Sequence, residues 1–149
     1  VVHEQRRRLG WTGNVNFLLA QVDTPYFFIY FHDDVLLPQY TERMLERLQA
    51  NPGAAGAYCD MGHFGDADHV STGPAYLGST VERLLVLMLA PQRGSPLRAL
   101  LRTERAGHLR LPDLDAAGLW ANEPFLMAMM AAGPVEHVPE VLYLRWSNR

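Results

Sequence analysis

The stretch Tyr26-Phe27-Phe28-Ile29-Tyr30-Phe31-His32-Asp33-Asp34 decides the expected fold. Its first six residues are all aromatic or β-branched, a pattern typical of a strand that is buried on both faces in the centre of a parallel sheet. The run then ends abruptly in a histidine and two aspartates. Because ligands of open α/β sheets bind beyond the carboxyl ends of parallel strands, candidate chemistry is expected at His32, Asp33 and Asp34.

A helix and a second strand are expected directly after this stretch. Between Pro38 and Ala50, apolar residues recur on one face of a helix, and Asn51-Pro52-Gly53 ends it. The run from Ala54 to Cys59 then predicts a second short strand. The order strand, helix, strand is typical of a βαβ unit and therefore predicts a parallel sheet.

The rest of the chain is assigned from its glycine and proline positions and from the periodicity of its apolar residues. We expect a loop over Met61–Gly78, helices over Val81–Ala90, Leu97–Thr103 and Asn122–Ala132, and two extended pieces at Val135–Val138 and Val141–Leu144, split by Pro139. Asn122 is the expected N-cap of its helix, and Gly133 is expected to end it.

Composition limits the class of protein and its partners. The chain has 149 residues, of which 48% are hydrophobic, and a net charge of −3, which fits one folded domain and gives no basic surface for nucleic acid. No lysine is present, so Schiff-base chemistry and the lysine-containing phosphate loop are excluded. Any phosphate must be met by arginine, histidine, backbone amides or a metal. Apolar runs such as Val81–Ala90 are too short to span a bilayer, which needs about 20 residues.

The two adjacent aspartates have two possible explanations. Carboxylates at the end of an apolar strand are costly unless they are compensated, and Mg²⁺ or Mn²⁺ bound to a phosphate would compensate them. Alternatively, Asp33 and Asp34 end the strand and cap the following helix. A second acidic and histidine-rich group follows the next strand and is either a metal site or a solvated loop; it comprises Asp60, His63, Asp66, Asp68 and His69.

Two blocks of this chain resemble the family 2 glycosyltransferases of the GT-A fold. In the first, a Gly/Asn-rich helix start at Gly10–Ala20 precedes the apolar strand, the acidic motif and Pro38. The second consists of Asn122-Glu123-Pro124-Phe125, then Ala132-Gly133, then Val138-Pro139-Glu140-Val141-Leu142-Tyr143-Leu144-Arg145. The resemblance implies an α/β domain with a Rossmann-like, mostly parallel sheet flanked by helices.

The resemblance also implies a metal-assisted transfer of a sugar from a nucleotide-diphosphate donor to an acceptor hydroxyl. The family's Asp-x-Asp motif holds Mn²⁺ or Mg²⁺ on the donor diphosphate. Here it falls on His32, Asp33 and Asp34, so Asp34 and His32 are the expected metal ligands and Asp33 is expected to contact substrate. The family's catalytic aspartate falls on or beside Asn122, which makes the adjacent Glu123 the expected base. The alternative for Glu123 is an acid that complements the helix dipole.

Four further residues are candidate substrate contacts. Asn14 and Asn16 lie at the expected start of a helix, where capping is the alternative role. Trp120 is expected to stack on a sugar or base, with core packing as the alternative. Arg145 follows the last strand-like piece, where the family pattern implies a basic residue near the diphosphate, and a surface role is the alternative.

The resemblance sets the expected extent, partners and location of the domain. Family members begin with a strand, helix and strand that carry the nucleotide-base pocket, so we expect a single domain over residues 1–149 that lacks this first βαβ unit. The expected partners are a nucleotide-sugar donor and a saccharide or lipid-linked acceptor, in the cytoplasm or at the cytosolic face of a membrane. The missing unit, His32 and Asn122 favour an alternative function, a non-catalytic binding module derived from the same fold.

Overall fold

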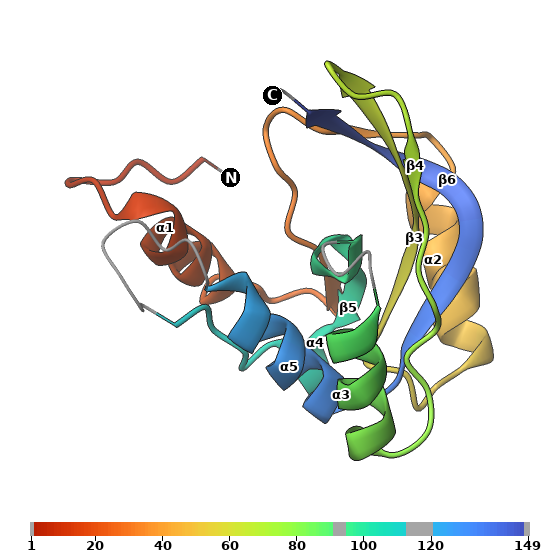
Figure 1. The fold of residues 1–149 in the computed structure, drawn as a ribbon. Helices are drawn as coiled ribbons and strands as arrows, with labels where there is room; N and C mark the ends of the chain where they lie inside the picture. Colours follow the sequence, from red (N-terminus) through yellow and green to blue (C-terminus); the bar gives the residue numbers. More distant parts are fainter. Residues whose placement is uncertain (1, 91–94, 113–120, 148–149) are drawn as a thin grey trace.

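In the computed structural model, which describes residues 2–90, 95–112 and 121–147, the chain folds around a curved six-stranded sheet (Figure 1). The strands are β1 (Tyr26–Phe27), β2 (Val35–Leu36), β3 (Gly56–Gly65), β4 (Val70–Ser71), β5 (Leu100–Arg102) and β6 (Val135–Ser147). The helices are α1 (Gly10–Leu19), α2 (Tyr40–Ala50), α3 (Thr80–Leu89), α4 (Thr103–Ala106) and α5 (Asn122–Ala132), with a 3-10 turn, η1 (Ser95–Arg98).

The chain combines helices with a sheet, so the α/β class is confirmed. The sheet is mixed, so the expectation of a mostly parallel sheet is wrong. Its order is β1-β5-β3-β6-β2, with β4 paired to β3. Among the described residues, β3 and β6 form the parallel pair, and the other four strand pairs are antiparallel. Strands β1 and β3 run in the same direction, as the βαβ pattern predicts. They are not neighbours, because β5 lies between them.

The aromatic run is not a central strand. Only Tyr26–Phe27 forms a strand, and it lies at the edge of the sheet, where it pairs antiparallel with β5. Ile29 and Phe31 pack against one apolar core, whereas Tyr26 and Phe28 pack against the other. The run is therefore apolar on both faces because its side chains enter two different cores, and not because strands flank it on both sides.

The helices agree better with the pattern than the strands do. Helix α2 buries Tyr40, Met44 and Leu48 on one face, as expected. Helix α5 covers the predicted residues, but Ala121 is its N-cap and no side chain caps it, so the prediction for Asn122 as cap is wrong. Helix α1 begins at Gly10, which places Asn14 and Asn16 inside the helix rather than at its start.

Three segments differ from their predictions for reasons of pairing. Strand β3 extends to Gly65 and pairs with β4, so part of the expected loop is sheet. Residues 100–102 form β5 instead of a helix, since their backbone pairs with both β1 and β3. The two C-terminal pieces are one strand, β6, and irregularities in its pairing around Asp60 accommodate Pro139 within it.

Two apolar clusters pack on the sheet and hold the helices to it. One lies with α5, and its buried members include Phe125, Leu126 and Met130. The other lies under α2 and includes Met44 and Tyr143. Figure 1 shows α2 against one side of the curved sheet, with α1, α3 and α5 on the other side. Within the described ranges, no helix has the length and apolar character needed to span a membrane.

Candidate functional site

Asp34 is the most tightly held residue of the acidic motif. Its side chain is only 2% exposed, and its Oδ2 accepts hydrogen bonds from the Nε of Arg98 at 3.0 Å and the hydroxyl of Tyr143 at 2.7 Å. Its Oδ1 accepts from the backbone N–H of Trp146 at 3.2 Å. The carboxylate thus joins the segment after β1 to both η1 and β6.

Burial and this carboxylate change the acidity of the neighbouring phenol. The pKa of Tyr143 is raised, first by burial and then by its hydrogen bond to Asp34. The phenol therefore stays protonated and donates its hydrogen to the carboxylate. Tyr30 adds a second phenolic hydrogen bond, from its hydroxyl to the backbone oxygen of Asp34 at 2.7 Å.

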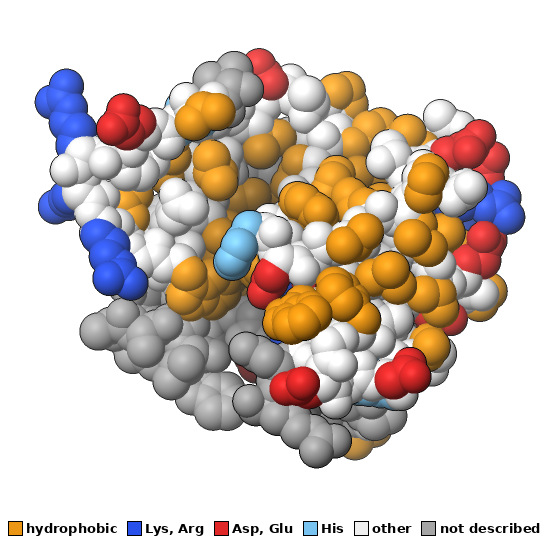
Figure 2. All heavy atoms as spheres, turned by 90° about the horizontal axis from the view of Figure 1, so that it is seen from above, with side chains coloured by type: hydrophobic (Ala, Val, Ile, Leu, Met, Phe, Trp, Pro, Cys, Tyr) orange, Lys and Arg blue, Asp and Glu red, His pale blue; other side chains and the backbone are white. Residues whose placement is uncertain are grey.

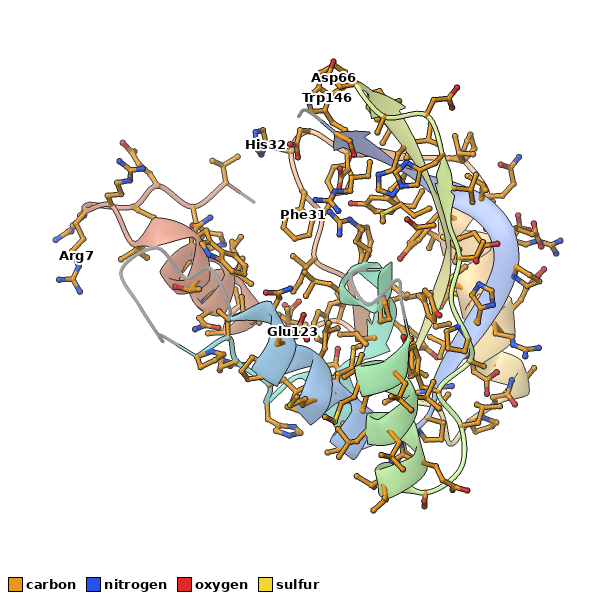
Figure 3. All side chains as sticks on the ribbon, in the orientation of Figure 1. Arg7, Phe31, His32, Asp66, Glu123 and Trp146 are labelled. Atoms are coloured by element: carbon orange, nitrogen blue, oxygen red, sulfur yellow. The ribbon has the colours of Figure 1, made fainter. Side chains whose placement is uncertain are left out.

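His32 and Asp33 differ from Asp34 because both are exposed. In Figure 3, Phe31 points into the space between the sheet and the helices α1 and α5, and His32 lies at the rim of that space. Glu123, at the start of α5, borders the same space from the opposite side in this view. The loop after the aromatic run therefore buries the Asp34 side chain and leaves His32 and Asp33 exposed to solvent.

A divalent cation at Asp34 does not fit this arrangement. Its carboxylate already accepts three hydrogen bonds, one of them from a cationic guanidinium, so a metal ion at Asp34 would have to displace Arg98. This pairing does not favour Asp34 as a metal ligand, and that role stays a prediction. His32 as a metal ligand and Asp33 as a substrate contact also stay predictions.

Among the described residues, the acidic and histidine-rich group of β3 and the turn after it does not form a cluster of metal ligands. Asp60 pairs with His137 of β6, its Oδ1 lying 2.7 Å from Nε2. His63 instead lies between two hydroxyls, with Nδ1 at 2.8 Å from Ser147 Oγ and Nε2 at 2.8 Å from Ser71 Oγ. Asp68 is exposed in the turn between β3 and β4.

His63 carries an electrostatic signature of the site. Its ring stacks on that of His69 with centroids 4.0 Å apart. Its pKa is lowered, mainly by burial and then by the charges of His69, Arg145 and Arg98, while Asp34 acts in the opposite direction. His63 therefore lies within the electrostatic reach of the Asp34–Arg98 pair, on the same side of the molecule.

An apolar cavity of about 350 Å³ separates α1 from the segment after β1. Trp11, Asn14 and Leu18 line it from the helix, and Phe31 and His32 line it from the other wall. Seen from above, hydrophobic side chains gather around a hollow in the surface (Figure 2). Asn14 is thus placed where it can contact a bound group.

Asn16 has a structural partner instead. Its Nδ2 donates to the backbone oxygen of Leu111 at 2.8 Å, and its Oδ1 accepts from the N–H of Leu111 at 2.8 Å. This reciprocal pair fastens the segment before α5 to α1.

The remaining predicted site residues lie on α5, on β6 and outside the described part of the chain. Asn122 and Glu123 are the first two residues of α5 and are both partly exposed. Arg145 is exposed on β6, opposite His63 in the parallel register. Trp120 lies outside the described residues.

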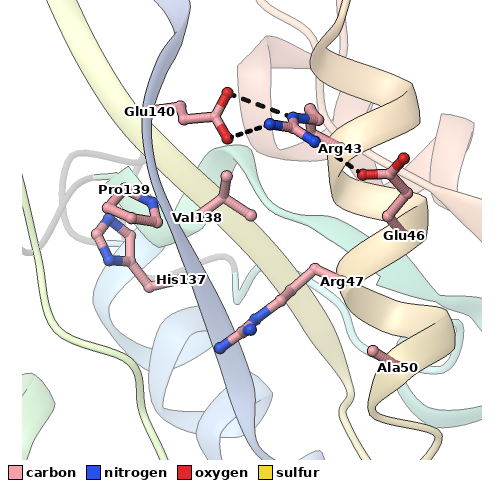
Figure 4. A pocket seen from close by; sticks show the side chains of 8 residues that line it. All are labelled: Arg43, Glu46, Arg47, Ala50, His137, Val138, Pro139 and Glu140. Carbon is pink, nitrogen blue, oxygen red and sulfur yellow. Dashed lines mark hydrogen bonds and ion pairs between the residues drawn. The ribbon is translucent and has the colours of Figure 1, made fainter.

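A second cavity, of about 320 Å³, lies between α2 and β6 and has its charges already paired (Figure 4). Arg43 contacts Glu140 at 2.9 Å and Glu46 at 3.1 Å, and Arg47 contacts Glu136 at 3.0 Å. The Arg43–Glu140 and Arg47–Glu136 pairs join α2 to β6, whereas the Arg43–Glu46 pair lies within α2. We assign all three to the structure rather than to binding.

Sequence reasoning missed the partners of Asp34. Arg98 lies 64 residues further along the chain, in a segment that the pattern assigned to a helix, and Tyr143 lies 109 residues away. The absence of lysine was the available signal, because it leaves arginine as the cation for any buried carboxylate or bound anion. In comparisons with known proteins, no family model matches the chain and no curated protein is similar to it.

Proposed function

We propose that this domain is a glycosyltransferase that moves a sugar from a nucleotide-diphosphate donor to the hydroxyl of a saccharide or lipid-linked acceptor. One observation carries the proposal. Three segments far apart in sequence border one side of the molecule: the loop at Phe31–Asp34, the start of α5 and the end of β6 (Figure 3). These are the segments to which the sequence resemblance assigns the donor and acceptor groups.

The proposed chemistry uses exposed and partly exposed residues of these segments. The Glu123 carboxylate takes the proton of the acceptor hydroxyl while the acceptor oxygen attacks the anomeric carbon. The bond between that carbon and the donor phosphate oxygen breaks, and the nucleoside diphosphate leaves with its negative charge. Arg145 supports this charge electrostatically, and His32 and Asp33 meet the donor at the loop.

A second candidate, a binding module without turnover, is favoured by one observation. The aspartate expected to hold a catalytic metal is instead paired with Arg98 at 3.0 Å. Such a module would bind the nucleotide sugar or its diphosphate without transferring the sugar.

Release of nucleoside diphosphate from a panel of UDP- and GDP-sugars in the presence of saccharide and lipid-linked acceptors, with and without Mn²⁺, separates the two candidates. We expect the unaltered chain to release it, and Glu123→Gln to lower the rate by about 10²–10⁴-fold, the usual contribution of general base catalysis. Glu104→Gln, at an exposed glutamate of α4, is the matched control and should leave the rate unchanged. Binding of a donor without any release would reject the enzyme and support the module.

A further inference from the structure

Arg98 is a buried cation whose hydrogen-bonding capacity is only partly used. Its side chain is 10% exposed, so about nine-tenths of it is buried. Within the described part of the chain, its Nε donates a hydrogen bond to Asp34 at 3.0 Å, and its guanidinium also interacts with the side chain of Tyr143. Neither Nη nitrogen is among the buried side-chain atoms that lack a hydrogen-bond partner. The outer edge of the guanidinium is therefore open to an incoming group.

Two aromatic rings determine the direction from which that group can come. The Phe31 ring covers one face of the guanidinium, with its centroid 4.6 Å from the Arg98 Cζ, and the Tyr143 ring lies 5.4 Å away. Because Phe31 covers one face, the N–H edge near the guanidinium plane is the favoured direction of approach for a ligand. A guanidinium presents a planar fork of N–H donors, which matches two oxygens of a phosphate or carboxylate.

The charges around Arg98 favour an anion with more than one negative charge. Asp34 compensates one positive charge, and Arg145 adds a second one nearby, because it directly precedes Trp146, whose backbone N–H bonds to Asp34. His63 adds no charge at neutral pH, because its pKa is lowered. Arg145 is exposed, and the described residues give it no ion-pair partner. A diphosphate could thus be held between the Arg98 fork and Arg145.

We propose that the Nη edge of Arg98 binds a phosphoryl group of the donor diphosphate, in the role that a divalent cation would otherwise fill. That the diphosphate belongs to a nucleotide sugar rests on the proposed function; the anion site itself rests on Arg98. Asp34 is the positioning residue, because its carboxylate fixes Nε and so aims the fork. The stacked Phe31 ring holds the guanidinium plane.

Titration calorimetry with inorganic pyrophosphate, with UDP and GDP as further probes, tests the site in EDTA and again in Mn²⁺. We expect binding in EDTA. Asp34→Asn keeps an oxygen for Nε and Tyr143 but removes the negative charge, so it should bind pyrophosphate as well as the unaltered chain or better. Asp34→Asn combined with Arg98→Gln removes the whole ion pair, leaves no buried unpaired charge, and should bind at least tenfold more weakly than Asp34→Asn.

Arg98→Lys provides a second variant that keeps a cation against Asp34. Lysine lacks the planar fork, so we expect a loss of about tenfold despite the retained charge. Circular dichroism confirms that each variant is folded. Equal binding by Asp34→Asn and the double variant would overturn the proposal.

Two further outcomes distinguish this inference from the proposed function. Binding that requires Mn²⁺ and disappears in Asp34→Asn would overturn the role of Arg98 and leave a metal-dependent transferase standing. Sugar transfer without any binding of pyrophosphate, UDP or GDP in EDTA would overturn it in the same way. Binding of pyrophosphate through Arg98 without turnover of any nucleotide sugar would support the site and reject the transferase.

Discussion

At the scale of single residues, Asp34 links segments that are distant in sequence through its hydrogen bonds. Its carboxylate accepts from Arg98, Tyr143 and Trp146, and its backbone oxygen accepts from Tyr30. A buried carboxylate is tolerated only when it is paired and fully hydrogen-bonded. The Asp34–Arg98 pair therefore has two roles. It holds the loop after β1 in place, and in our proposal it orients the Arg98 guanidinium toward a ligand.

Removing the cation should destabilise the fold more than removing the pair. Arg98→Met leaves the Asp34 carboxylate buried without its partner, and we expect the free energy of unfolding to fall by about 3–5 kcal/mol. The double variant Asp34→Asn with Arg98→Met should lose clearly less. Urea denaturation of both variants checks this, and a single variant as stable as the unaltered chain would show that the pair is unimportant.

His63 should make the stability of the protein depend on pH. Its pKa is lowered below its ordinary value of 6.5 in the folded chain, so at pH values below 6.5 the unfolded chain binds the proton more readily. The free energy of unfolding should hold above pH 6.5 and fall as the pH drops through the folded pKa.

Denaturation at pH 7.5, 6.5 and 5.5 (all about 25 °C) measures this dependence. His63→Gln should flatten it, because glutamine does not titrate. His108→Gln, at an exposed histidine, is the control and should retain the slope of the unaltered chain. An equal slope in His63→Gln would contradict the assignment.

At the scale of elements, α3 has the best-defined start among the described helices. The Ser79 side chain accepts from the N–H of Glu82, and the Glu82 carboxylate accepts from the N–H of Ser79, which forms a capping box. Ser79→Ala should lower the free energy of unfolding by about 1 kcal/mol, whereas Ser79→Asp should retain most of the cap. Urea midpoints of the two variants measure the difference, and equal midpoints would mean that the cap does not stabilise this helix.

Elements held by local signals could be predicted from the sequence, and elements held by pairing could not. The apolar stripe of α2 and the glycine after α5 mark those helices because both signals lie within one or two turns. The partners of β1 and β5 come from distant segments, so the pattern around Phe28 could not show that the aromatic run lies at an edge. An aromatic run that enters two apolar cores at the edge of a sheet has the same composition as a buried central strand, so composition alone does not distinguish them.

At the scale of the whole molecule, the residue types of the site could be predicted, but their position relative to the sheet could not. We predicted His32–Asp34 at the carboxyl end of a central parallel strand. Strand β1 instead ends at Phe27 and pairs antiparallel with β5, so these residues lie in the loop before β2. The pairing of Asp34 with Arg98 depends on how η1 folds back against the sheet, which no local pattern records. The family resemblance supplied roles for Glu123 and Arg145, which stay proposals.

The most direct test of a diphosphate site on this side of the molecule is an NMR titration of the isotope-labelled chain with UDP and GDP in EDTA. The N–H of Trp146, the Nε–H of Arg98 and the backbone of Phe31–Asp34 should shift in a saturable way, while amides of α3 should stay unchanged. Shifts confined to α3, or no saturable shift in the Phe31–Asp34 loop, would contradict the site.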